Sequence, residues 1–160
     1  MWRNRLKNPL KTEHDAREVA LGLLARREHS KRELIIKLRA RGCPEKIITQ
    51  VIDQLAAEGM QSNARFAESF VRSRIDRGRG PLRIRGEMIV RGLEDEEINE
   101  ALLQYEDRWR DLALEIYNKH YGENVSSADF EERAKRSGFM QRRGFTADQI
   151  RYAIEHPKRA

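Results

Sequence analysis

Residues 63–93 read NARFAESFVRSRIDRGRGPLRIRGEMIVRGL. Phe66 and Phe70 stand four positions apart, which places both side chains on one face of a helix. Gly78, Gly80 and Pro81 then interrupt the helical pattern. A second helix is expected after the interruption, and its apolar side consists of Leu82, Ile84, Met88 and Ile89. The stretch therefore predicts two helices joined by a glycine-containing turn.

Arginine is concentrated in the same stretch. It holds eight arginines against three acids, Glu68, Asp76 and Glu87. A guanidinium group can bind phosphate or carboxylate through two parallel hydrogen bonds. A solvated helix face is the alternative, since most charge runs end in solvent. We predict a surface that binds a protein partner or nucleic acid, formed by Arg72, Arg74, Arg77, Arg79, Arg83, Arg85 and Arg91.

The composition of the whole chain agrees with a polyanionic partner. The 160 residues carry a net charge of +6 and a pI near 9.7, which favours nucleic acid or an acidic protein surface. Charged residues make up 36% of the chain, as expected of amphipathic helices with solvated outer faces. Cys43 is the single cysteine, and no apolar run approaches the length of a membrane span. We expect a soluble protein located in the cytoplasm.

A pattern of apolar residues recurs about every fifty residues around a glycine. Gly42, Gly92 and Gly144 lie 50 and 52 residues apart. Apolar residues stand at fixed offsets of −4, +6, +9 and +10 from each glycine: Leu38, Met88 and Met140; Ile48, Ile98 and Ile150; Val51, Ala101 and Ala153; Ile52, Leu102 and Ile154. Fixed offsets of this kind indicate an internal repeat.

Each copy of the repeat reads as three helices. Ser30 and Glu33 form a capping-box pattern at the second helix of the first copy, and Pro44 suits the first residue of its third helix. Acids at 94–97 begin the last helix of the second copy, and Thr146 with Gln149 begins that of the third. In the third copy, Trp109 to Tyr117 supply the first helix, Gly122 ends it, and Ser126 or Ser127 is expected to cap the next.

We predict an all-α protein of three tandem three-helix repeats. The expected divisions are a basic flexible tail at 1–14 and repeats at 15–59, 60–105 and 106–160. One repeat is too small to close its own core, so neighbours should stack into an elongated, curved molecule with a concave face.

Catalytic chemistry finds little support in the sequence. The four histidines are scattered without a second histidine or cysteine at metal-ligand spacing, and Cys43 has no histidine nearby. The acids at 94–97 are explained by the helix dipole, and the glycines near residue 79 lack the lysine and hydroxyl of a phosphate-binding loop. We therefore expect no enzyme, no metal and no cofactor.

Several motifs resemble the RecX family, bacterial regulators of the recombinase RecA. The central motif is RFAESFVRSR at 65–74 followed by GPLRI at 80–84, Glu87-Met88 and Gly92-Leu93. The first repeat adds SKREL at 30–34 and Lys37-Leu38, and the third adds RRGF at 142–145, so the resemblance covers about residues 15–156. Asn63 stands where the family often has an acid, and Met88 replaces a usual leucine.

The resemblance implies three helical repeats and a non-enzymatic cytoplasmic inhibitor. Such a protein would bind RecA filaments on single-stranded DNA and suppress strand exchange, ATP hydrolysis and coprotease activity, in homologous recombination, DNA repair and the SOS response. Some family members also bind DNA themselves, so double-stranded DNA is a further candidate partner. We expect a monomer with no membrane partner.

Our hypothesis is that a bent rod lies in the groove of the filament and spans adjacent protomers, with the arginines on filament carboxylates or DNA phosphates. Binding at a growing filament end remains open beside binding along its length. The alternative is a helix-turn-helix-like DNA-binding protein that acts without a recombinase. A third class, a nuclease, would need carboxylates clustered around a metal.

Overall fold

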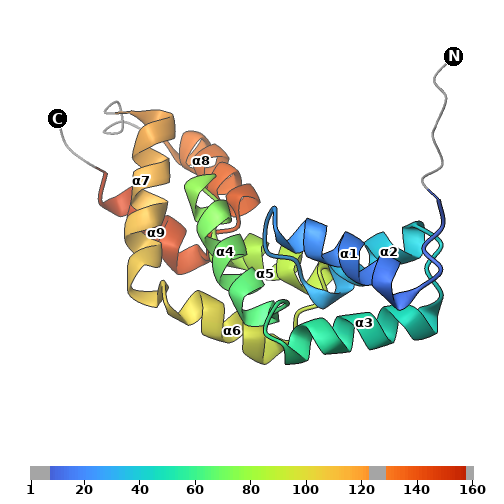
Figure 1. Ribbon diagram of the computed structural model, residues 1–160. Helices are drawn as coiled ribbons and strands as arrows, with labels where there is room; N and C mark the ends of the chain where they lie inside the picture. Colours follow the sequence, from blue (N-terminus) through green and yellow to red (C-terminus); the bar gives the residue numbers. More distant parts are fainter. Residues whose placement is uncertain (1–7, 123–128, 158–160) are drawn as a thin grey trace, which may run out of the picture. The chain divides into compact units, whose positions relative to one another are not determined.

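Helices account for all the regular structure of the described residues. The computed structural model describes residues 8–122 and 129–157, and within these ranges it contains nine α-helices, one 3₁₀ turn and no strand (Figure 1). The elements are α1 (Glu13–Leu24), α2 (Lys31–Ala40), α3 (Glu45–Ala57), α4 (Asn63–Asp76), α5 (Pro81–Val90), α6 (Asp95–Leu103), the 3₁₀ turn η1 (Glu106–Arg108), α7 (Trp109–Tyr121), α8 (Phe130–Arg143) and α9 (Ala147–Glu155). The all-α prediction is confirmed. None of the described helices is both long and apolar enough to cross a membrane.

The described residues form two compact units. Unit 1 comprises residues 8–66 and 91–93, and unit 2 comprises 67–90, 94–122 and 129–157. Helices α1, α2 and α3 belong to unit 1, while α7, α8 and α9 belong to unit 2. The elongated, curved shape inferred from the repeats stays a prediction.

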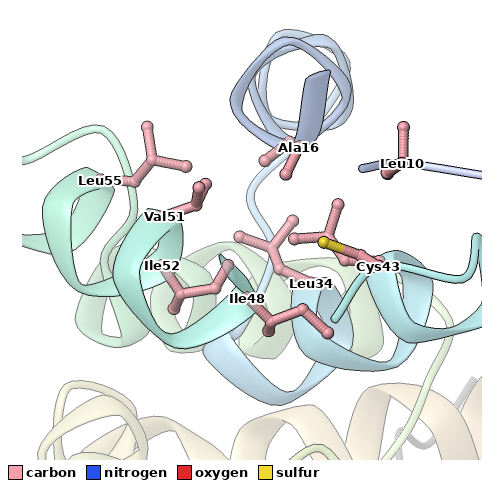
Figure 2. Packing of buried hydrophobic residues seen from close by; sticks show 10 residues of the cluster. Leu10, Ala16, Leu34, Cys43, Ile48, Val51, Ile52 and Leu55 are labelled. Atoms are coloured by element: carbon pink, nitrogen blue, oxygen red, sulfur yellow. The ribbon is translucent and has the colours of Figure 1, made fainter. Parts of the chain in front are cut away.

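The core of unit 1 lies between its first three helices. Figure 2 shows Ile48, Val51 and Leu55 of α3 in one cluster with Leu34 of α2 and Ala16 of α1. These five side chains are almost completely excluded from solvent. Burial of apolar surface at about 25 cal/mol per Å² therefore stabilises this triplet of helices, as the spacing of the apolar positions predicts.

The chain before α1 differs from the expected flexible tail. Leu10 is only 5% exposed, and its backbone amide donates to the carbonyl oxygen of Arg41 over 3.1 Å. Thr12 then caps α1, since its hydroxyl accepts from the amide of Asp15. Leu10 gains more from burial than from solvation, so a tail reaching residue 14 is wrong for residues 10–14. Residues 1–7 of that prediction lie outside the described residues.

The repeat glycine follows the end of a helix in a left-handed backbone conformation in each copy. Gly42, Gly92 and Gly144 adopt φ values of +71°, +81° and +96°, a left-handed conformation that suits glycine at the end of a helix. The apolar residues at the fixed offsets are buried in every copy except Ile154, which is half-buried. The helical repeat deduced from these offsets is confirmed.

Most of the predicted helix caps are present. Ser30 and Glu33 exchange hydrogen bonds of 3.2 Å between side chain and backbone, and Thr146 and Gln149 do the same at the start of α9. Pro44 differs, because it is the residue before α3 rather than the first residue inside it.

The cap of α8 also differs from the prediction. The carboxylate of Asp129 accepts from the amide of Glu132 over 2.8 Å, so Asp129 begins this helix. The serines expected in that role, Ser126 and Ser127, lie outside the described residues. Aspartate is as good an N-cap as serine, and Asp129 stands at the required spacing before Glu132.

The apolar side of α5 is only partly buried. Ile84 and Met88, four residues apart, are completely buried as predicted. Leu82 and Ile89 are 56% and 50% exposed, because they stand seven residues apart on one face of the helix, which points away from the face of Ile84 and Met88. The predicted four-residue apolar side is therefore wrong for its two outer members.

Candidate functional site

Two glycine turns of unit 2 lie against each other through their backbones. The amide of Gly80, in the turn between α4 and α5, donates to the carbonyl oxygen of Arg143 over 2.7 Å. The amide of Leu82 donates to the carbonyl oxygen of Gly144 over 2.9 Å. A Cβ on Gly80 would lie 2.5 Å from the carbonyl carbon and oxygen of Gly144, so only glycine permits this approach. The contact fixes the arginines around residue 80 beside the end of α8.

An open pocket of about 550 Å³ lies next to this contact. Four of its lining side chains carry a positive charge and one carries a carboxylate, and the remaining three are aromatic or aliphatic. The pocket is lined by Asp76, Arg77, Arg79, Ile116, Lys119, His120, Phe139 and Arg143. We call it the basic pocket. Its net positive charge favours an anionic ligand.

The guanidinium groups of the basic pocket form no ion pair with a carboxylate of the described residues. Within residues 8–122 and 129–157, no ion pair involves Arg77, Arg79 or Arg143. Burial lowers the pKa of Arg79, and the positive charges of Arg83 and Arg143 lower it further. A bound anion would relieve this repulsion between like charges. The Nη1 atom of Arg143 donates to the carbonyl oxygen of Arg77 over 3.2 Å, which orients the Arg143 side chain.

Two of the predicted arginines share one carboxylate inside unit 2. The Nε atom of Arg74 lies 2.6 Å from Glu87, and the Nε atom of Arg83 lies 3.3 Å from the other oxygen of the same carboxylate. Burial raises the pKa of Glu87, but hydrogen bonds from Arg74 and Arg83 lower it by more, so the net pKa lies below its ordinary value. The guanidinium group of Arg74 also lies 4.2 Å from the ring centroid of Phe70. Arg74 and Arg83 therefore shape the turn beside the basic pocket.

The other three predicted arginines occupy separate places. Arg72 is exposed on α4 and forms no ion pair with any described residue. Arg85 donates a hydrogen bond to the side chain of Asn99 on α6. Arg91 belongs to unit 1, where its Nε atom lies 3.6 Å from Glu33. The seven arginines thus do not form one cluster, and the structure brings together Arg74, Arg77, Arg79 and Arg83.

The basic pocket also contains residues that the sequence reasoning did not select. His120 of α7 stacks on Phe139 of α8 with ring centroids 3.9 Å apart and an angle of 18° between the rings. Arg143 places its guanidinium group 5.1 Å from the centroid of Phe139. Lys119 adds a further cation. We call His120 and Phe139 the aromatic wall of the pocket.

A sequence signal for Arg143 was available. An arginine precedes the repeat glycine in each copy, as Arg41, Arg91 and Arg143. The sequence holds no comparable signal for Lys119, His120 and Phe139, because their position in the pocket depends on how α7 and α8 pack.

Two other side chains of reactive types, a cysteine and a histidine, are buried in unit 1. Cys43 is buried, and burial raises the pKa of its thiol, which keeps it protonated. His29 is buried too, and burial lowers the pKa of its imidazole. Among the described residues, no group of three or more histidine, cysteine or acidic side chains is arranged to hold a metal ion.

The fold and the pocket together define a class of protein: an all-helical tandem repeat with a positively charged pocket beside a glycine turn. Sequence models of the RecX family match most of the chain: the first three-helix domain of RecX at residues 16–55, the second at 62–102 and the third at 106–154. The chain belongs to the RecX family. The matched ranges fall inside the predicted repeats 15–59, 60–105 and 106–160, whose exact boundaries stay a prediction.

Individual relatives support the same assignment. The chain is 46% identical over 140 residues to the regulatory protein RecX of Chromohalobacter salexigens, covering 88% of this chain and 91% of the relative. It is 47% identical over 137 residues to that of Halorhodospira halophila, covering 86% and 84%. The fold is similar to the crystal structure of RecX from Lactobacillus salivarius, with a TM-score of 0.79, 22% identity and coverage of 89% and 94%.

Proposed function

We propose that this protein is a non-enzymatic regulator that binds recombinase filaments on single-stranded DNA. It inhibits strand exchange, ATP hydrolysis and coprotease activity, and so modulates recombination and repair. Membership of a family whose relatives are named regulatory proteins supports a regulatory role. The observation that carries the binding mode is the set of guanidinium groups at Arg77, Arg79 and Arg143, which have no acidic partner among the described residues.

The proposed contact is electrostatic. Arg77, Arg79 and the exposed Arg72 face phosphates of the DNA or carboxylates of the filament, because a guanidinium group binds either anion with two hydrogen bonds. Arg74 and Arg83 hold the turn in place through Glu87. Occupation of the filament groove then excludes the second duplex and favours disassembly. The protein acts in the cytoplasm as a monomer.

A triple substitution tests this proposal. Replacing Arg72, Arg77 and Arg79 with alanine removes three charges that form no ion pair in the described part of the chain, so the fold is preserved. The control replaces Arg26, Arg133 and Arg151, which are also exposed and without an ion pair there. Inhibition in a strand-exchange assay is lost in the first variant and kept in the control, while circular dichroism shows equal helix content. Unchanged inhibition by the first variant refutes the proposal.

The mode of filament binding is tested by stoichiometry. Binding along the groove predicts that inhibition of recombinase ATP hydrolysis rises in proportion to added protein until the filament is covered. Full inhibition at a small fraction of that amount identifies binding at the growing end instead.

A second candidate is a DNA-binding protein that acts without a recombinase, which the basic pocket also supports because phosphate is a suitable ligand. A mobility-shift titration with and without recombinase separates the two. Binding that never depends on the filament, and weakens steeply with added salt, favours this second candidate.

A further inference from the structure

We propose that the basic pocket of unit 2 binds one unstacked nucleotide of single-stranded DNA. The phosphate lies on Arg77, Arg79 and Arg143, and the base lies on the aromatic wall. This inference rests on the proposed function, in which single-stranded DNA is part of the partner, and it names the chemical group that the pocket recognises.

The size and position of the pocket suit such a ligand. Its volume of about 550 Å³ falls within the roughly 300–1,000 Å³ typical of sites for small organic groups. Its walls come from the α4–α5 turn, α7 and α8. The backbone bonds from Gly80 and Leu82 to the end of α8 hold two of these walls together, so the site is formed before a ligand arrives.

The phosphate side of the pocket consists of the three guanidinium groups of Arg77, Arg79 and Arg143. Arg79 is half-buried among like charges, and its lowered pKa reflects both effects. Arg143 is oriented by its bond to the carbonyl oxygen of Arg77. Asp76 is the one carboxylate among the described residues that line the pocket, and Glu87 offsets part of the repulsion at Arg79.

The aromatic wall favours a nucleotide over an acidic peptide as the anionic ligand. An acidic peptide needs cations alone, whereas a nucleotide also offers a planar base that stacks on aromatic rings. The exposed His120 ring is backed by Phe139 at 3.9 Å, so a base can extend this stack from the His120 side, and Ile116 adds an apolar contact surface. Bases of a duplex remain stacked on one another, so only a single strand presents a base to this wall.

Photocrosslinking tests the placement directly. A single-stranded oligonucleotide carrying 5-iododeoxyuridine, free or coated with recombinase, is irradiated with the full-length protein, and the adduct is mapped by mass spectrometry. The expected adduct lies on the peptide with His120 or on that with Phe139. Adducts confined to peptides outside the basic pocket overturn the proposal.

A substitution in the aromatic wall tests the role of the base. Phe139→Leu keeps an apolar side chain, and it should weaken binding of an oligothymidylate about fivefold or more. The affinity for an abasic oligonucleotide of equal length should stay unchanged. Phe130→Leu is the control, because Phe130 is 89% exposed on the same helix and does not line the pocket. An equal loss with both oligonucleotides shows that the base makes no contact and refutes the proposal.

Two further measurements address charge and the source of the ligand. Asp76→Asn removes the opposing carboxylate and should tighten oligonucleotide binding several-fold; weaker binding argues against an anion in the pocket. Free thymidine monophosphate should compete only weakly, and affinity equal to that of the oligonucleotide identifies a free nucleotide as the ligand instead.

The two proposals fail in different ways. If the triple arginine variant loses inhibition while Phe139→Leu binds both oligonucleotides normally, the filament regulator stands and the nucleotide pocket does not. If inhibition survives in the triple variant, the proposed function itself fails, whatever the crosslinking shows.

Discussion

The backbone amide of Gly80 donates to the carbonyl oxygen of Arg143 across 63 positions of sequence, over 2.7 Å. This bond joins the turn that carries Arg77 and Arg79 to the helix end that carries Arg143. The basic pocket exists because these two turns meet, so its geometry and the stability of unit 2 depend on the same contact.

We predict that Gly80→Ala destabilises the protein by about 1–3 kcal/mol, because the added methyl group would overlap the Gly144 carbonyl group. Urea unfolding followed by circular dichroism measures the change. Gly86→Ala is the matched control: Gly86 lies inside α5 with open space around it, so alanine should stabilise by about 0.5–1 kcal/mol. Equal effects of the two substitutions would show that the turns are not in close contact.

A second prediction concerns Ser30. Its hydroxyl accepts from the amide of Glu33 and donates to the carbonyl oxygen of Arg91 over 2.8 Å. Ser30→Ala should therefore cost about 2 kcal/mol in unfolding free energy, the sum of a lost cap and a lost buried hydrogen bond. Thr146→Ala removes a cap alone and should cost about 1 kcal/mol. If the two variants are equally stable, the bond to Arg91 contributes nothing.

The pH dependence of stability should report on Glu87. Its folded-state pKa lies below the ordinary value of 4.5, so its ionised form stabilises the fold above that pH, and this contribution is lost as the pH falls through the folded pKa. Glu87→Gln should lower stability at pH 7 by about 1–2 kcal/mol and give a flatter profile below pH 4.5. Urea midpoints from pH 3 to 7 test this. Parallel profiles for both proteins would exclude Glu87 as the source.

Salt dependence provides the fourth prediction. Each phosphate contact with single-stranded DNA contributes about 0.7 to the slope of log affinity against log salt. Arg77→Gln combined with Arg79→Gln should therefore reduce the slope by about 1.4. Anisotropy titrations of a labelled oligonucleotide at several salt concentrations measure it. Arg133→Gln combined with Arg151→Gln should leave the slope unchanged, and a similar reduction in this control would indicate diffuse attraction without a defined site.

The predictions that succeeded depend on short-range patterns. The Ser30–Glu33 cap joins groups three residues apart, and the glycine offsets reflect which face of each helix is buried. Such relationships follow from helix geometry and are visible in the sequence. The resemblance to the RecX family rests on the same kind of local motif.

The basic pocket could not be derived in this way. It requires residues 76–79 to meet residues 116–120 and 139–143, and this depends on how separate helices pack. Glu87 was counted as one acid among many arginines, whereas the structure places it between Arg74 and Arg83. Leu82 illustrates a different error, since it was assigned to the buried side of α5 although its position around the helix is nearly opposite Ile84, and it is exposed.

One backbone feature recurs beyond the pocket. The arginine before each repeat glycine offers its carbonyl oxygen to a donor upstream in the chain: Leu10 for Arg41, Ser30 for Arg91 and Gly80 for Arg143. The first and second copies thus each supply a donor, Ser30 and Gly80, to the carbonyl oxygen at the glycine turn of the copy that follows. Gene duplication can lengthen such a chain by one repeat at a time, because a duplicated repeat already carries the carbonyl oxygen that accepts from the donor of the preceding repeat.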